Sequence, residues 1–103
     1  MLRQLNGITG KHITTAGIIT TAGKPGLLYG YTLIAGTDAT SIIFKNGGAS
    51  GTVLWKDTIK GQTAAGDATV SYTFTEPVVF STDIYATLAG TDAALSVAYY
   101  QLG

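Results

Sequence analysis

The sequence predicts an all-β fold, an antiparallel β-sandwich of about eight strands with a jelly-roll-like arrangement. Apolar and polar residues alternate in several segments, as they do in strands with one buried face. Fourteen glycines and many threonines interrupt the windows in which a helix would need a regular apolar period. Turn signals recur roughly every 8–12 residues, a spacing typical of sandwiches and barrels.

The expected strands follow one another closely along the chain. In Thr69–Phe74, the clearest of them, Val70, Tyr72 and Phe74 point to one face and the intervening polar residues to the other. The segment 95–100 repeats this alternation and places its two adjacent tyrosines on opposite faces. In chain order the predicted strands are residues 11–15, 17–21, 27–35, 40–46, 52–59, 68–75, 78–81, 84–89 and 93–102.

Glycine, proline, asparagine and aspartate mark the connections between these strands. Residues 21–26 contain both glycine and proline, residues 46–51 begin with Asn-Gly, and residues 60–67 form a third long loop. Residues 76–77, Glu-Pro, and residues 81–83 are shorter breaks, so we expect separate strands before and after the proline.

A five-residue sequence, Ala-Gly-Thr-Asp-Ala, occurs at residues 35–39 and again at residues 89–93. Glycine permits a positive φ, and threonine and aspartate side chains bond nearby backbone groups, so we expect the same turn to be closed twice. A site formed by the paired carboxylates of Asp38 and Asp92 is the other interpretation. It offers one carboxylate per turn, whereas calcium takes about six to eight oxygen ligands.

The 103 residues suffice for one domain, which we place at residues 11–103, preceded by an N-terminal arm at residues 1–10. Charged residues make up only 12% of the chain, against roughly 25% in typical soluble domains, and the formal net charge is zero. Such a surface favours association, which indicates that a partner covers much of it. Alternatively, threonine, serine, glycine and glutamine keep a lightly charged monomer soluble.

Composition and motifs exclude several function classes. The six basic residues are scattered, which argues against nucleic-acid binding, and no apolar run approaches the roughly 20 residues of a membrane span. The N-terminus lacks the apolar segment of a secretory signal, and the absence of cysteine fits a reducing cytoplasm. His12 is the only histidine, without a nucleophile motif, phosphate loop or metal-ligand set. We therefore expect no enzyme activity and no cofactor, with His12 at the surface.

Aromatic side chains are the remaining chemical resource of the sequence. Tyr72 and Tyr99 lie on apolar strand faces and are expected in the core, whereas Tyr100 is expected outside it. Trp55 fits the core and the surface equally. Tyrosine and tryptophan are enriched at protein interfaces and also offer flat surfaces on which sugar rings stack, so three uses of these residues stay open.

Four segments together resemble a known group of proteins. They are Thr-Ala-Gly-Lys-Pro-Gly-Leu-Leu-Tyr-Gly-Tyr at residues 21–31, Gly-Thr-Asp-Ala-Thr-Ser-Ile-Ile-Phe-Lys-Asn-Gly at 36–47, Pro-Val-Val-Phe-Ser-Thr-Asp-Ile-Tyr-Ala-Thr-Leu-Ala-Gly-Thr at 77–91, and Ala-Leu-Ser-Val-Ala-Tyr-Tyr at 94–100. This order of strands and turns resembles small virion proteins of tailed bacteriophages, notably capsid cement or decoration proteins with a jelly-roll-like sandwich.

The resemblance implies a structural protein, made in the host cytoplasm, that forms a homo-oligomer, often a trimer, on the outside of a capsid. There it would clamp neighbouring subunits of the major capsid protein. The resemblance implies no catalytic residues in this chain, because proteins of this group carry none. Small jelly rolls of this kind also serve in tails, baseplates and head fibres, and a carbohydrate-binding β-sandwich module is the alternative from another class.

Five apolar or aromatic residues are the candidates for the interface. Leu2, Leu5 and Ile8 alternate with polar neighbours in the N-terminal arm, which either orders on binding or is a frayed terminus. Trp55 and Tyr100 are the aromatic candidates. We expect these residues to contact other copies of the chain or other virion proteins.

Overall fold

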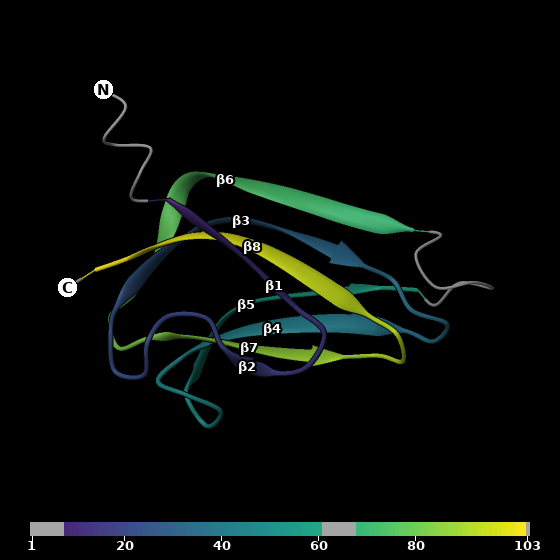
Figure 1. The fold of residues 1–103 in the computed structure, drawn as a ribbon, viewed down its shortest axis with the longest axis horizontal. Coiled ribbons are helices and arrows are strands. Elements are labelled where there is room, and N and C mark those ends of the chain that lie inside the picture. Colours follow the sequence, from purple (N-terminus) through teal and green to yellow (C-terminus); the bar gives the residue numbers. More distant parts are fainter. Residues whose placement is uncertain (1–7, 61–67, 103) are drawn as a thin grey trace.

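A computed structural model describes residues 8–60 and 68–102, which form eight strands and, within those ranges, no helix (Figure 1). Sheet A has the antiparallel strand order β1-β8-β3-β6, and sheet B has the order β2-β7-β4-β5. The predicted all-β sandwich is therefore confirmed. The strands are β1 (Thr9–Ile13), β2 (Gly17–Ile18), β3 (Gly26–Ile34), β4 (Thr40–Asn46), β5 (Thr52–Ile59), β6 (Thr69–Phe80), β7 (Ile84–Ala89) and β8 (Ala94–Gln101).

The strand pairing makes the fold a jelly roll. β1 pairs with β8, β2 with β7, β3 with β6 and β4 with β5, so the two halves of the chain form one long antiparallel hairpin. Rolling this hairpin up brings β8 beside β3 and β7 beside β4, which are the two other strand pairs. Eight strands wound in this way into two sheets are the jelly-roll arrangement that the sequence predicts.

The core lies between the two sheets and follows from the alternation of the central strands. In β3, Leu28, Tyr31 and Leu33 are buried, and Leu95 and Val97 of the neighbouring β8 point the same way. Burying such side chains contributes about 1.5–3 kcal/mol each. The buried cluster consists of Ile19, Leu28, Tyr31, Leu33, Ile42, Phe44, Phe80, Ile84, Ala86, Leu95 and Val97.

The predicted break at residues 76–77 is wrong, because β6 is one strand that bends (Figure 1). Leu28 pairs with Val78 and Gly30 pairs with Thr73, so residues 74–77 lie opposite the single residue Tyr29. Pro77 lies within this bulge, where its missing N–H removes no bond from the ladder. The bulge bends the strand and so continues sheet A past the proline.

The first two strands differ in extent from the predicted ones. β1 begins at Thr9, inside the segment predicted as an arm, and ends before the predicted strand does. β2 comprises only Gly17–Ile18, although Ile19 and Thr20 beyond it are buried. Residues 1–7 of the predicted arm and residues 61–67 of the predicted third loop lie outside the described residues.

Three loops meet at one end of the sandwich, which we call the glycine-loop end. Asp83, in the β6–β7 loop, is buried, and its carboxylate accepts hydrogen bonds from the backbone N–H groups of Gly23 at 3.2 Å, Gly47 at 3.2 Å and Gly48 at 2.9 Å. All three glycines have positive φ, which turns their N–H groups toward the carboxylate at little steric cost. One side chain therefore joins the loops after β2, β4 and β6.

The two repeated pentapeptides meet at the opposite end, which we call the echo-turn end. The carboxylate of Asp38 accepts hydrogen bonds from the backbone N–H of Thr91 at 2.6 Å and from its hydroxyl at 3.0 Å. The turns were expected to be closed by local bonds, but Asp38 bonds the other turn instead. These bonds hold the pKa of the Asp38 carboxyl below its ordinary value, because they favour the charged form.

Candidate functional site

The structure places the five predicted interface residues in three different situations. Ile8 and Tyr100 are exposed, at 41% and 37% of their surfaces. Trp55 is half-buried and packs against the core. Leu2 and Leu5 lie outside the described residues. As predicted, Tyr100 lies outside the core while Tyr99 packs against it.

Ile8 and Tyr100 belong to a band of apolar side chains that crosses the outer face of sheet A at the glycine-loop end. Leu27 of β3 pairs with Tyr100 of β8 on one side and with Val79 of β6 on the other, so all three point outward together. Ile8 directly precedes Thr9, which pairs with Tyr99, and therefore lies at the same end. We call Ile8, Tyr100, Leu27 and Val79 the apolar band.

Val79 is the most exposed large apolar residue of the band, at 60%, and Leu27 is half-buried beside it. The sequence analysis missed both residues, because Val78-Val79 reads as two equivalent apolar residues after a proline. Only the register reveals that Val78 faces the core and Val79 faces outward. Predicting the outward direction of Val79 would have required continuing the strand, with its alternation, through residue 77.

Trp55 belongs to a cluster of aromatic rings along the edge where β5 and β6 face each other. Its ring centroid lies 4.8 Å from that of Tyr72 and 4.9 Å from that of Phe74. Trp55 Nε1 donates a hydrogen bond to the Tyr31 hydroxyl at 2.8 Å, and that hydroxyl donates to Asp57 at 2.7 Å. Burial, with the neighbouring carboxylate, raises the pKa of Tyr31 to about 12.

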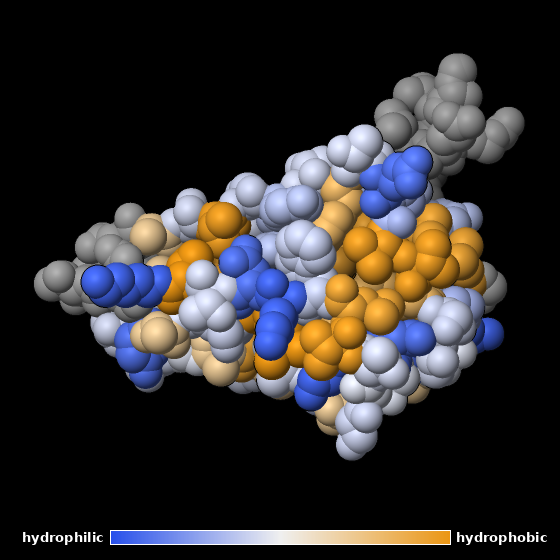
Figure 2. All heavy atoms as spheres, turned by 180° about the vertical axis from the view of Figure 1, so that it is seen from behind, coloured by the Kyte–Doolittle hydropathy of each residue, from blue (hydrophilic) through white to orange (hydrophobic). Residues whose placement is uncertain are grey.

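This aromatic edge is only partly covered. Tyr72, expected in the core, is 42% exposed, because β6 bounds sheet A and no further strand covers the ring among the described residues. Val53 and Leu54 of β5 are also exposed, and the register pairs Val53 with Lys45. Figure 2 shows apolar surface gathered toward the end of this edge at which β6 bends. The chain therefore exposes apolar residues both in the apolar band and on β5.

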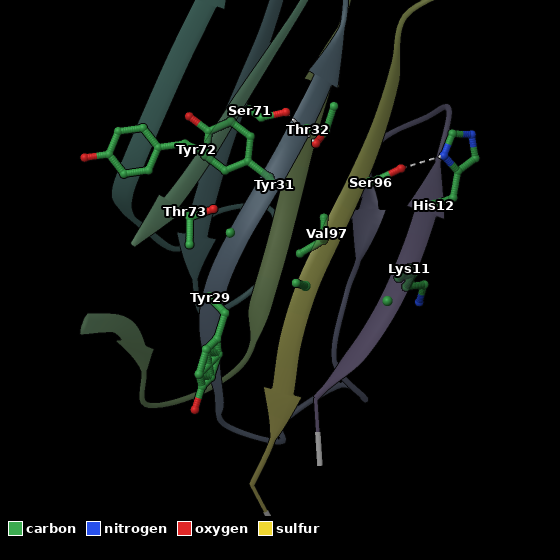
Figure 3. A pocket seen from close by; sticks show the side chains of 13 residues that line it. Lys11, His12, Tyr29, Tyr31, Thr32, Ser71, Tyr72, Thr73, Ser96 and Val97 are labelled. Atoms are coloured by element: carbon green, nitrogen blue, oxygen red, sulfur yellow. Dashed lines mark hydrogen bonds between the residues drawn. The ribbon is translucent and has the colours of Figure 1, made fainter. Parts of the chain in front are cut away.

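A groove of about 540 Å³ crosses the outer face of sheet A next to the apolar band (Figure 3). Its floor is a row of residues with little or no side chain, Gly10 of β1, Ala98 of β8 and Gly30 of β3, which are register neighbours. The next row of side chains across the same strands, on the side of the floor toward the echo-turn end, is polar. It consists of His12, Ser96, Thr32 and Ser71.

The bulge in β3 supplies the aromatic wall of the groove. Because Leu28 pairs with Tyr99 and Gly30 with Ala98, Tyr29 is an extra residue in β3, and its half-buried ring lies beside the floor. Figure 3 shows Tyr29 toward one end of the groove and Thr32, Ser96 and His12 toward the other. The aromatic ring and the hydroxyl groups thus flank the same bare stretch of sheet.

The polar row is organised by its own hydrogen bonds. His12 Nδ1 lies 3.1 Å from Ser96 Oγ, and Thr32 Oγ1 lies 2.9 Å from Ser71 Oγ. Lys11 also lines the groove, but its ammonium donates to the carbonyls of Ile18 and Ile19 on the other side of β1. No Asp or Glu from the described ranges lines the groove. His12 is exposed, as predicted.

The sequence contained one signal for this groove. Gly10 and Gly30 are isolated glycines within strands, a pattern that marks bulges and places where another group approaches the backbone closely. Gly30 is at a bulge, and a Cβ there would lie 2.6 Å from the backbone oxygen of Tyr72. A Cβ on Gly10 would meet nothing closer than 4.0 Å, so the space above it is open.

Two further observations concern the parts of the chain that the structure describes. They contain no group of three or more His, Cys, Asp and Glu side chains placed to hold a metal ion. None of their elements is a helix with the length and apolar character needed to cross a membrane.

No protein-family model and no curated protein matches the sequence. Among solved structures, the chain is similar to one described as "Bacillus endospore appendages form a novel family of disulfide-linked pili", with 19% identity and a TM-score of 0.47. The likeness covers 93% of this chain and 89% of that chain.

Proposed function

We propose that this chain is a non-enzymatic structural protein of a tailed-bacteriophage virion, a capsid cement or decoration protein. It forms a homo-oligomer, a trimer by the resemblance of its sequence, and clamps subunits of the major capsid protein through non-covalent contacts. The observation that carries the proposal is the apolar band of Ile8, Tyr100, Leu27 and Val79 on a surface poor in charge.

The band is suited to association because of its composition and its position. Single exposed apolar residues are ordinary on monomers, but this group is continuous across β8, β3 and β6. Val53 and Leu54 of β5 are further exposed apolar residues, outside the band. Fully burying an exposed valine or leucine contributes on the order of 1.5–3 kcal/mol, and these partly exposed side chains each contribute a fraction of that, set against the cost of association.

Weak contacts become effective when several copies act together. A trimer that engages several coat subunits converts later binding events into intramolecular ones and gains avidity without new contacts. The chain exposes apolar residues both in the apolar band and on β5, so one of these surfaces can contact another copy while the other contacts the coat. Variants in the apolar band and variants on β5 would show which surface contacts another copy and which contacts the coat.

The solution mass of the purified chain tests self-association. Light scattering after size exclusion should give about three times the monomer mass of 10.6 kDa. Val79→Asp introduces a charge into the apolar band and should return the mass to that of the monomer. Thr69→Asp is the matched control, because Thr69 is exposed on the outer face at the other end of the same strand. A monomeric wild-type chain would contradict the homo-oligomer.

Co-sedimentation with capsids prepared without this protein tests the second contact. Wild-type chain should pellet with the capsids, whereas Leu54→Asp or Val79→Asp should leave at least part of it in solution. Failure of the wild-type chain to bind capsids, with its oligomeric mass intact, would remove the cement role and favour another virion location such as the tail or a head fibre.

A further inference from the structure

We propose that the groove on the outer face of sheet A binds a neutral saccharide, with one sugar ring stacked on Tyr29 and its hydroxyl groups bonded by the polar row. This is a binding function beyond the structural role proposed above. It concerns different residues from the apolar band, so the two proposals can fail separately.

The size and shape of the groove fit a small ligand. Its volume of about 540 Å³ lies within the range of roughly 300–1,000 Å³ that small-molecule sites occupy. The floor formed by Gly10, Ala98 and Gly30 crosses three strands, a distance of roughly 10 Å between the outer two. Gly10 is exposed and Ala98 is half-buried, so a flat ring can lie on the sheet above these two residues, whereas Gly30 is buried at the inner end of the floor.

The chemistry of the lining selects a neutral ligand rich in hydroxyl groups. Ser96, Thr32 and Ser71 each offer a hydroxyl that both donates and accepts, and His12 keeps one ring nitrogen outside its bond to Ser96. The Lys11 ammonium is held on the far side of β1, and no carboxylate of the described residues lines the groove. Within the described ranges, the only ammonium or carboxylate group at the groove is therefore one that already donates to backbone carbonyls.

Tyr29 supplies the apolar contact that a sugar ring also needs. The C–H groups of a pyranose form an apolar face that packs on an aromatic ring, while its hydroxyls point outward around the rim. In the groove, the aromatic wall and the hydroxyl row lie on opposite sides of the bare floor (Figure 3). This separation matches a ligand with an apolar face and a polar rim, which distinguishes it from a wholly apolar peptide side chain.

Trp55 is not part of this site, although the sequence left sugar stacking open as one use of this residue. Its ring packs against Tyr72 and Phe74, and its N–H donates to Tyr31. The register places it on the inner side of sheet B, paired with Phe44. Trp55→Phe is therefore a useful control that keeps an aromatic ring in the cluster.

The first experiment is a screen of the labelled full chain against an array of neutral and acidic glycans. The best neutral glycan is then titrated into ¹⁵N-labelled protein, where amide shifts should concentrate at residues 10–12, 29–32, 71–73 and 96–98. We expect a millimolar Kd. Tyr29→Ala should weaken it about tenfold, corresponding to the loss of one stacking contact.

Gly10→Val tests the floor without disturbing the fold. A Cβ at Gly10 has free space, and valine favours strands, so the variant should fold while its side chain fills the groove and abolishes binding. Tyr29→Phe and Trp55→Phe should bind like the wild type. Tyr29→Ala should also keep the oligomeric mass, which separates this site from the self-association surface.

Three results would overturn the proposal. They are the absence of any neutral glycan that binds at millimolar concentration, binding that survives both Tyr29→Ala and Gly10→Val, and a preference for acidic glycans. Amide shifts that centre on the apolar band or on the aromatic edge would place the ligand elsewhere and would equally contradict the assignment to this groove.

Discussion

The two ends of the sandwich each depend on one aspartate, in contrasting surroundings. At the glycine-loop end, Asp83 is buried and its carboxylate is surrounded by backbone N–H groups of three glycines. At the echo-turn end, Asp38 is exposed and its carboxylate bonds one residue, Thr91, of the facing turn. Both join loops that are far apart in the sequence.

The difference shows how burial changes what a carboxylate contributes. A buried carboxylate must have its hydrogen bonds satisfied, and removing it also leaves its donors unpaired, so the loops depend on it strongly. An exposed carboxylate competes with water for the same donors, and its loss is partly replaced by solvent. At the echo-turn end the closeness of the two backbones, rather than the aspartate, is the stronger constraint.

Replacing Asp83 should have the largest effect. Asp83→Ala leaves three backbone N–H groups without their acceptor at a buried position, which should lower the free energy of unfolding by about 3 kcal/mol. Urea denaturation followed by tryptophan fluorescence measures the change. Asp38→Ala serves as the comparison at the other end and should cost clearly less. Equal losses for the two variants would refute the distinction between the ends.

A methyl group at Gly36 should have the next largest effect. A Cβ there would overlap the backbone oxygen of Thr91 in the facing turn, so the two turns must separate, at a cost of about 2 kcal/mol. Gly48→Ala is the matched control at the glycine-loop end. Its Cβ has free space but its φ is 82°, so it should cost only about 1 kcal/mol of backbone strain. A larger loss of stability from Gly48→Ala than from a Cβ at Gly36 would show that backbone strain outweighs the steric overlap between the turns.

The smallest effect is expected from the charge of Asp38. Its pKa is lowered in the folded state, so the stabilisation is fully present above the ordinary value near 3.8 and disappears as the pH falls through the folded-state value. Thermal unfolding between about pH 5 and pH 2 should therefore be less pH-dependent in Asp38→Asn than in the wild type. Identical pH profiles for the two proteins would show that the bonds to Thr91 contribute nothing in solution.

The sequence allowed the fold class to be predicted because alternation is a local property. The polar and apolar residues of β3, β4 and β8 specify one buried face each, and the predicted strands at 27–35, 40–46 and 93–102 match the structure within about one residue. Pro77 misled the prediction, since a bulge can place a proline within a strand and only the partner strand shows that it does.

The candidate sites were harder to predict because each depends on strands distant in the sequence. The apolar band needs the register of β8, β3 and β6, and the groove floor needs that of β1, β8 and β3. Tyr100 was identified because its neighbour Tyr99 had to face the other way. Tyr29 and Tyr31 lie on different faces because a bulge separates Leu28 from Gly30, and no local pattern indicates that bulge.

The rolled hairpin also has a consequence for how the chain folds. β4 and β5 are close in sequence and can pair early, but each further pair of the hairpin closes a longer loop, ending with β1 and β8. Such a high contact order predicts slow folding, on the millisecond-to-second scale of non-local β proteins. During synthesis β1 emerges first, yet it must wait unpaired until β8 has left the ribosome.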